Sequence, residues 1–262
     1  MQAIKIGTCG YERYTPPKDW KKKFKNKLQA YADAFHACEL NSTFYNLPTR
    51  KTAERWRSEV PEDFTFCIKA FQAITHLPTS PTWRRAGIKP TKDQLNRYGW
   101  LRPTNENFEA WLQTKEICDA LEAKVCVIQC PPNFKCTPEN VANMREFFSK
   151  IDRGKLTLAW EPRGNWKEYS DEIAKLCEEL ELVHVVDLMR REPLSKHSIA
   201  YIRLHGLNPR EYDYNYNYSL TELKQLATKA KALAKKHREV YIMFNNYSMY
   251  DNAQQLMKIL KV

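Results

Sequence analysis

The chain lacks several features that would define its class directly. No apolar run approaches the roughly 18 residues that a membrane span requires, so we expect no membrane segment. No secretory-signal layout precedes the first strand-like segment, 4–7 (IKIG). No Gly-x-Gly-x-x-Gly follows that segment and no P-loop is present, which disfavours dinucleotide binding and P-loop chemistry. Cys-x-x-Cys and His-Glu-x-x-His, two common zinc signatures, are also missing.

The eight cysteines are scattered, and several lie within apolar runs. A disulfide framework is not expected at this size, so the pattern indicates buried thiols and a reducing cytoplasm. Cys126, Cys130 and Cys136 are spaced like a cluster, but two of them fall on the predicted helix-facing side of a strand. We interpret these as buried thiols. Cys9 is the best nucleophile candidate, although the sequence names no base for it.

Positive charge is abundant and unevenly spread. The net charge is +11, with a balance of +6 over residues 1–60, −2 over residues 111–200 and +5 over residues 201–262. Two interpretations stay open: a solvated lysine-rich surface, or a basic face that attracts nucleic acid or anionic metabolites.

Strand-like and helix-like segments alternate along the chain. The β segments are 4–9, 37–41, 65–70, 125–130, 156–161, 183–187, 201–206 and 240–246. The expected helices are 20–35, 49–58, 104–121, 138–149, 169–180, 220–236 and 252–260. This alternation in 262 residues predicts an α/β fold, a closed (β/α)₈ TIM-like barrel forming a single domain over 1–262. An irregular stretch at about 74–103, rich in Trp, Arg and Pro, is expected to form a long ordered loop, such as a lid.

Polar residues end many of these apolar strands, and they share one face in each. Successive strand side chains point to opposite faces, so Cys67 and Lys69 oppose Phe66 and Ile68. The same parity selects one inward polar set, close to the carboxyl ends where barrel enzymes place their active sites. Its members are Glu39, Asn41, Lys69, Gln129, Glu161, Arg163, Asp187, Arg203, His205 and Asn245.

Chemical roles follow from residue type. Glu39 and Glu161, from strands three apart, form a candidate acid/base pair, with His205 as a further catalytic candidate. A clamp for a carboxylate or phosphate is predicted from Lys69, Arg163 and Arg203, and Asn41, Gln129 and Asn245 complete the predicted substrate-binding set.

Two alternatives concern this polar set. A metal could be held by Glu39, Glu161, Asp187 and His205, but cations match carboxylates here, so we favour an anion pocket without metal or cofactor. The set could also be structural, with interior pairs of Glu39 with Lys69 and of Asp187 with Arg203.

Six short motifs, in order along nearly the whole chain, resemble the DUF72 (YecE-like) family. They are ELNSTFY (39–45), FCIKA with ITH (66–76), QCPP (129–132), WEPR (160–163), YIRLHG (201–206) and FNN (244–246). The resemblance implies a TIM-barrel-like fold and little about activity. Its recurrent motif residues coincide with all members of the inward polar set except Asp187. One departure is TCGY (8–11), where the family more often has Ser-Gly-Trp.

These observations lead to three functional hypotheses. The first is an enzyme whose pocket at the barrel mouth binds a small anionic, phosphorylated or sugar-like substrate and uses acid/base chemistry. The second is a nucleic-acid-binding or nucleic-acid-processing protein, based on the basic charge, the 21–27 lysine run and the tyrosine-rich loop 208–218. The third is a barrel that binds a metabolite without catalysis. The fold alone does not choose among them.

Overall fold

Eight parallel strands form one sheet in the order β6-β5-β4-β3-β2-β1-β8-β7. The computed structural model describes residues 3–262. The strands are β1 (Ala3–Thr8), β2 (Ala37–Leu40), β3 (Thr65–Lys69), β4 (Val125–Gln129), β5 (Thr157–Glu161), β6 (Val183–His184), β7 (Ile199–Leu204) and β8 (Glu239–Phe244). Between β6 and β7 there is one isolated parallel bridge, Val186 with Ile202, and the Arg203 N–H donates to Val186 O over 2.9 Å. The sheet is therefore nearly closed into a TIM-like barrel.

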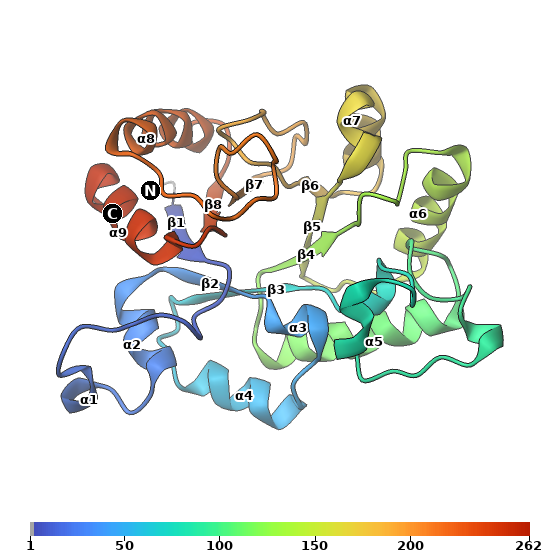
Figure 1. The fold of residues 1–262 in the computed structure, drawn as a ribbon, viewed down its shortest axis with the longest axis horizontal. Coiled ribbons are helices and arrows are strands. Elements are labelled where there is room, and N and C mark those ends of the chain that lie inside the picture. The colour runs from blue at the N-terminus through green and yellow to red at the C-terminus, as the bar shows by residue number, and fades with distance from the viewer. Residues whose placement is uncertain (1–2) are drawn as a thin grey trace.

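Helices surround the strands in Figure 1, as the strand–helix alternation predicts. They are α1 (Trp20–Lys23), α2 (Lys27–Ala34), α3 (Ser42–Tyr45), α4 (Arg50–Ser58), α5 (Asn105–Ala120), α6 (Pro138–Lys150), α7 (Ser170–Glu179), α8 (Leu220–Ala234) and α9 (Met249–Leu260). Four 3₁₀ turns are η1 (Gln72–Ile74), η2 (Pro81–Arg85), η3 (Lys92–Gln94) and η4 (Gly164–Glu168). Among residues 3–262, no helix has the length and apolar character to cross a membrane.

Two cores lie on opposite faces of the sheet, and they divide the strand residues as the parity predicts. The large outer core packs sheet against helices and includes Phe66, Ile68 and Trp160. The inner core fills the barrel with smaller groups and two stacked tyrosines, Tyr201 and Tyr241. A polar side chain on the inner face therefore points into the barrel.

Two segments differ from the sequence-based expectation. The predicted helix 20–35 is split into α1 and α2, because the Asn26 side chain accepts from Gln29 N–H and so begins a new helix. The predicted strand 183–187 shortens to β6. There Asp187 Oδ1 accepts from Met189 N–H at 3.0 Å, which turns the chain at the strand end.

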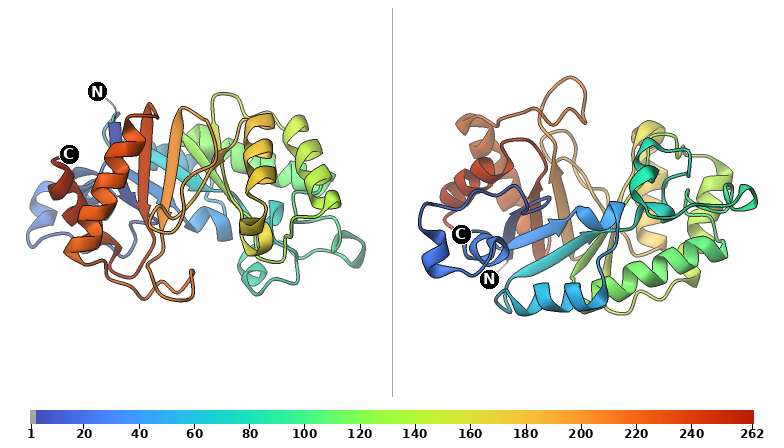
Figure 2. Two further views of the ribbon diagram at one scale, coloured as in Figure 1. Left: turned by 90° about the horizontal axis from the view of Figure 1, so that it is seen from above. Right: turned by 60° about the horizontal axis from the view of Figure 1, so that its bottom comes forward.

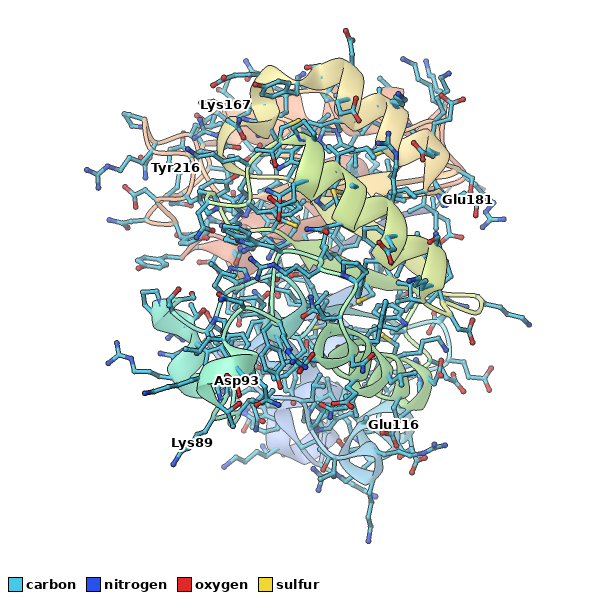
Figure 3. The ribbon with its side chains drawn as sticks, turned by 90° about the vertical axis from the view of Figure 1, so that its right-hand side faces the viewer. Lys89, Asp93, Glu116, Lys167, Glu181 and Tyr216 are labelled. Atoms are coloured by element: carbon cyan, nitrogen blue, oxygen red, sulfur yellow. The ribbon has the colours of Figure 1, made fainter. Side chains whose placement is uncertain are left out.

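The long loop predicted at 74–103 folds into η2 and η3. Asn107 at the start of α5 fixes it, because its side chain both accepts from Gly99 N–H and donates to Gly99 O, at 3.0 Å each. Trp83 is buried against Tyr98, with ring centroids 5.4 Å apart. Figure 3 shows Asp93 and Lys89 from this loop on the same side of the molecule as Lys167 and Tyr216, whereas Glu181 lies on the opposite side. The loop thus belongs to the face on which the strands end.

Candidate active site at the barrel mouth

Arg203, on the inner face of β7, is the centre of the mouth and is 1% exposed. Its Nη2 donates to Glu39 Oε1 at 2.9 Å, and its Nη1 donates to Glu161 Oε2. Weaker contacts reach Gln129 Oε1 at 3.3 Å and Asn41 Oδ1 at 3.5 Å. One guanidinium therefore ties β2, β4, β5 and β7 together, in a fork geometry that suits arginine.

Glu39 is fully buried, and both of its carboxylate oxygens accept hydrogen bonds. Besides the Arg203 contact at Oε1, Oε2 accepts from the Tyr201 hydroxyl at 2.9 Å. Tyr201 and Arg203 point to the same face of β7, so the alternation of strand side chains also places Tyr201 inside the barrel. The predicted site did not include it. The arrangement leaves Glu39 oriented by two fixed donors.

Glu161 is held by two arginines. Arg163 Nε donates to Oε1 at 2.7 Å, and Arg203 takes Oε2. Burial alone would raise the pKa of Glu161, but the charges of Arg163 and Arg203 outweigh it and hold this pKa well below the usual range of a carboxyl. Glu161 is therefore ionised at neutral pH, a state suited to orienting cations and unsuited to a general acid. The acid/base role predicted for the Glu39–Glu161 pair stays a prediction.

Lys69 ends β3 on the inner face and is 8% exposed. It makes no ion pair within residues 3–262, because Glu39 pairs with Arg203 and Glu161 pairs with both Arg163 and Arg203. Its Nζ instead lies 3.8 Å from the ring centroid of Phe44 in α3. Burial lowers the pKa of Lys69 to about 7, and the charges of Arg203 and Arg163 act in the same direction. The alternative in which Lys69 pairs with Glu39 is thus not what the structure shows.

His205 follows β7 and is 3% exposed. Neither ring nitrogen has a hydrogen-bond partner within residues 3–262, and the ring lies against Tyr212 and Tyr214, at centroid distances of 5.3 and 5.6 Å. Burial lowers the pKa of His205 well below its usual value, so the imidazole is neutral. A buried neutral ring with two unpaired nitrogens is costly unless a ligand or water completes it.

The tyrosine-rich loop 208–218 covers part of the mouth. The Tyr212 ring also lies 3.8 Å from the Arg163 guanidinium carbon, a stacked cation–π contact. Tyr218 accepts from Gly206 N–H at 2.9 Å, which anchors the loop to the end of β7. Gly206 has φ +102°, and a Cβ there would overlap with Tyr216, so glycine is required for this anchoring. Figure 2 (left) shows this loop, in orange, extending beyond the strand ends.

Two hollows open beside this covering loop. One, of about 620 Å³, is lined by amides and tyrosines, among them Asn41, Tyr45, Tyr214, Asn245 and Tyr247. The other, of about 470 Å³, is lined by residues that include Arg163, His184, Arg191 and Tyr212. Asn41 and Asn245 thus lie at the wall of the first hollow, whereas Lys69 and His205 are nearly buried and line neither hollow.

The surroundings of Asp187 and Cys9 differ from those expected for a partner of Arg203 and for a nucleophile. Asp187 accepts from the backbone N–H groups of His205 (3.1 Å) and Met189 (3.0 Å), not from Arg203, and burial raises its pKa to about 6. The Cys9 thiol accepts from Arg203 Nη2 at 3.7 Å, yet burial, together with Glu39, raises its pKa well above the usual value. A protonated Cys9 is a poor nucleophile. Cys126 and Cys130 are buried on the helix-facing side.

Fold and site together define an α/β protein of the TIM-like barrel type, with a polar mouth in which two carboxylates bind arginines and Lys69 has no acidic partner among residues 3–262. The chain belongs to the DUF72 family, described as a protein family of unknown function, whose model matches residues 5–262. It is 26% identical to the UPF0759 protein YunF of Bacillus subtilis in an alignment 292 residues long, gaps included. The alignment covers 99% of this chain and 95% of that protein. A 67-residue segment is 36% identical to YecE of Escherichia coli, covering 26% of this chain and 24% of YecE.

Solved structures show the same fold. A DUF72 family protein from Enterococcus faecalis superposes with a TM-score of 0.72 at 20% identity, covering 100% of this chain and 99% of that one. A DUF72 family protein from Thermotoga maritima gives 0.68 at 24% identity, with 99% of each chain covered. More distant likenesses include a D-tagatose 3-epimerase-like protein (TM-score 0.54, 14% identity, 98% of each chain) and SacUVDE (0.57, 10%, 100% and 98%). At these identities the likeness concerns the fold alone.

Proposed function

We propose that the protein is an enzyme whose barrel mouth binds a small anionic substrate. The observation that carries this proposal is Lys69, an amine 8% exposed and without an ion pair among residues 3–262, in a site whose two carboxylates are already bound to arginines. Three cationic side chains, Lys69, Arg163 and Arg203, face the two carboxylates of Glu39 and Glu161. Both glutamates pair with the arginines, so a Lys69 ammonium has no acidic partner of its own among residues 3–262, and a buried unpaired charge is costly.

An anionic ligand would supply the missing counter-charge. Arg203 Nε has no hydrogen-bond partner within the described residues, and neither have the ring nitrogens of His205. An oxyanion bound near Lys69 would accept from such donors and would shift the equilibrium of Lys69 toward the ammonium form. In this assignment Glu39 and Glu161 orient Arg203 and Arg163, while Lys69 is the group that gains or loses a proton near neutral pH.

The hollow lined by Asn41, Asn245 and tyrosines supports a substrate that is also rich in hydroxyl groups. Amides and tyrosine hydroxyls offer hydrogen bonds, and tyrosine rings offer flat apolar faces. The structural likeness to a D-tagatose 3-epimerase-like protein is compatible with a sugar-like substrate, although it concerns only the fold.

Sulfate titration by calorimetry tests the proposal, because sulfate keeps its charge across the relevant pH range. At pH 6 and low ionic strength we expect saturable binding at one site. Lys69→Met, which keeps an apolar chain against Phe44, should weaken binding at least tenfold, and Lys69→Arg should retain it. Lys23→Met, at an exposed lysine paired with Asp33, is the matched control. Equal sulfate affinity in the wild type and Lys69→Met would refute the proposal.

Nucleic acid is a second candidate ligand. It is supported by the net charge of +11 and by Lys21, Lys22 and Lys23, which lie exposed on the short helix α1. Lys22 and Lys23 already pair with Asp19 and Asp33, which reduces the free charge of this patch. We therefore rank the small anion first.

A further inference from the structure

We propose that Lys69 is a nucleophile whose amine forms an imine with an aldehyde or ketone group of the substrate. The substrate class is then a small carbonyl compound that carries an anionic group. This inference rests on the proposed function, since the cationic mouth would bring such a molecule to Lys69.

The surroundings of Lys69 are those that a nucleophilic lysine needs. An amine attacks carbon only when it is unprotonated, and low polarity or neighbouring cations favour that state. Lys69 is nearly buried, makes no ion pair among residues 3–262, and lies against the face of Phe44. The charges of Arg203 and Arg163 are close enough to lower its pKa further, after burial, to about 7. The free-amine fraction at neutral pH is then far larger than that of an ordinary lysine.

The chain builds this environment locally. The Thr43 hydroxyl lies 2.6 Å from Leu40 O and 2.6 Å from Lys69 O, which fixes α3 against the ends of β2 and β3. Phe44, the next residue, is thereby held over the Lys69 side chain. The apolar wall is therefore a packed part of the mouth, since Phe44 is 2% exposed.

Other lysines of the chain have different partners. Lys5, on β1, is partly exposed and donates to Thr65 Oγ1, at the start of β3, at 2.5 Å. Lys23, Lys150 and Lys196 pair with acidic side chains and are exposed. They provide internal comparators within the same molecule.

The reaction balances without an oxidant or a reductant. The Lys69 nitrogen lone pair forms a C–N bond to the carbonyl carbon while the C=O π electrons move to oxygen. Two protons from the amine leave with that oxygen as water when the C–O bond breaks, and a C=N bond remains. An imine withdraws electrons from neighbouring bonds, so the chemistry it permits is proton removal or carbon–carbon cleavage beside the former carbonyl.

Reductive trapping tests the inference. The whole protein is treated at pH 7 with glyoxylate, an aldehyde bearing a carboxylate, and sodium cyanoborohydride, which delivers hydride to the imine carbon. Peptide mass spectrometry then gives the carboxymethylation rate at each lysine. An ordinary lysine has about a thousandfold smaller free-amine fraction at pH 7 than one with a pKa near 7. We expect Lys69 to be labelled at least tenfold faster than Lys5 or Lys23, with saturation in glyoxylate and slowing by sulfate.

Variants separate this inference from the proposed function. Lys69→Arg keeps the charge but has no nucleophilic amine, so it should bind sulfate and show no trapping at position 69, with surface labelling unchanged. Wild-type protein that binds sulfate but labels Lys69 no faster than Lys23 would overturn the imine and leave the anion site standing. Wild-type protein that neither binds sulfate nor labels Lys69 selectively would overturn both.

Discussion

Replacing Arg203 by Met should destabilise the protein strongly, because it leaves two buried carboxylates without their shared cation. Arg203 and Glu39 are 1% and 0% exposed as side chains, and Glu161 is almost as buried. Removing one partner of a buried ion pair costs about 3–5 kcal/mol. Glu161 keeps Arg163 and Glu39 keeps Tyr201, so the loss should stay within that range and not double it.

Urea unfolding followed by tryptophan fluorescence and by circular dichroism measures this loss at pH 7. Arg50→Met is the matched control, since the Arg50–Glu54 pair is exposed and an exposed pair contributes only about 0–1 kcal/mol. Adding Glu39→Gln to Arg203→Met should recover part of the stability, because one of the unpaired charges is then removed. A loss below about 1 kcal/mol in Arg203→Met would refute the central role given to this guanidinium.

The same variant has a defined pH signature. The folded-state pKa of Glu161 is depressed, so its ionisation adds stability above the unfolded-state pKa of about 4.3, and this stability is lost as pH falls toward the folded-state value. Arg203→Met removes part of that contribution. The stability difference between wild type and variant should therefore shrink as pH is lowered below about 4.3, and a constant difference over that range would contradict the assigned cause.

Four further predictions address other parts of the site. Sulfate affinity should fall up to about tenfold per pH unit above pH 7, as Lys69 loses its proton, and Lys69→Arg should flatten this profile in calorimetry. Tyr201→Phe should cost about 1–3 kcal/mol in urea unfolding, because Glu39 Oε2 loses its buried donor. Gly206→Ala should cost about 1–3 kcal/mol in the same assay, given φ +102° and the overlap with Tyr216. If nucleic acid is a ligand, fluorescence anisotropy should show oligonucleotide affinity falling steeply with salt; binding that is insensitive to salt would contradict the basic-patch hypothesis.

The ion pairs inside the mouth could be predicted from the sequence only in part. Parity placed Glu39, Glu161 and Arg203 on one inner face, and the structure places them there. It offered Asp187 as the partner of Arg203, on the neighbouring strand, whereas Arg203 reaches across the barrel to Glu39 and Glu161. Which charged groups form ion pairs depends on the stagger of the strands around the barrel and on the reach of each side chain. The local sequence pattern determines neither.

The contacts of residues outside the strands could not be predicted from the sequence. Phe44 and Tyr212 contact Lys69 and Arg163, yet they come from α3 and from the tyrosine-rich loop, where no strand period assigns a face. The motif containing Phe44 and the aromatic content of loop 208–218 marked these segments without giving their contacts. Loops depend on long-range packing, so their side-chain positions follow only from the assembled fold.

The sequence by itself determined the α/β alternation, the TIM-like barrel type and the inner face of each strand, because the two-residue period of a strand is a local property of the backbone. Only the tertiary structure decided that both glutamates bind arginines and that Lys69 is left without an acidic partner. That outcome depends on which strands face one another across the barrel, and it is what moves the predicted chemistry from a carboxylate pair to a buried amine.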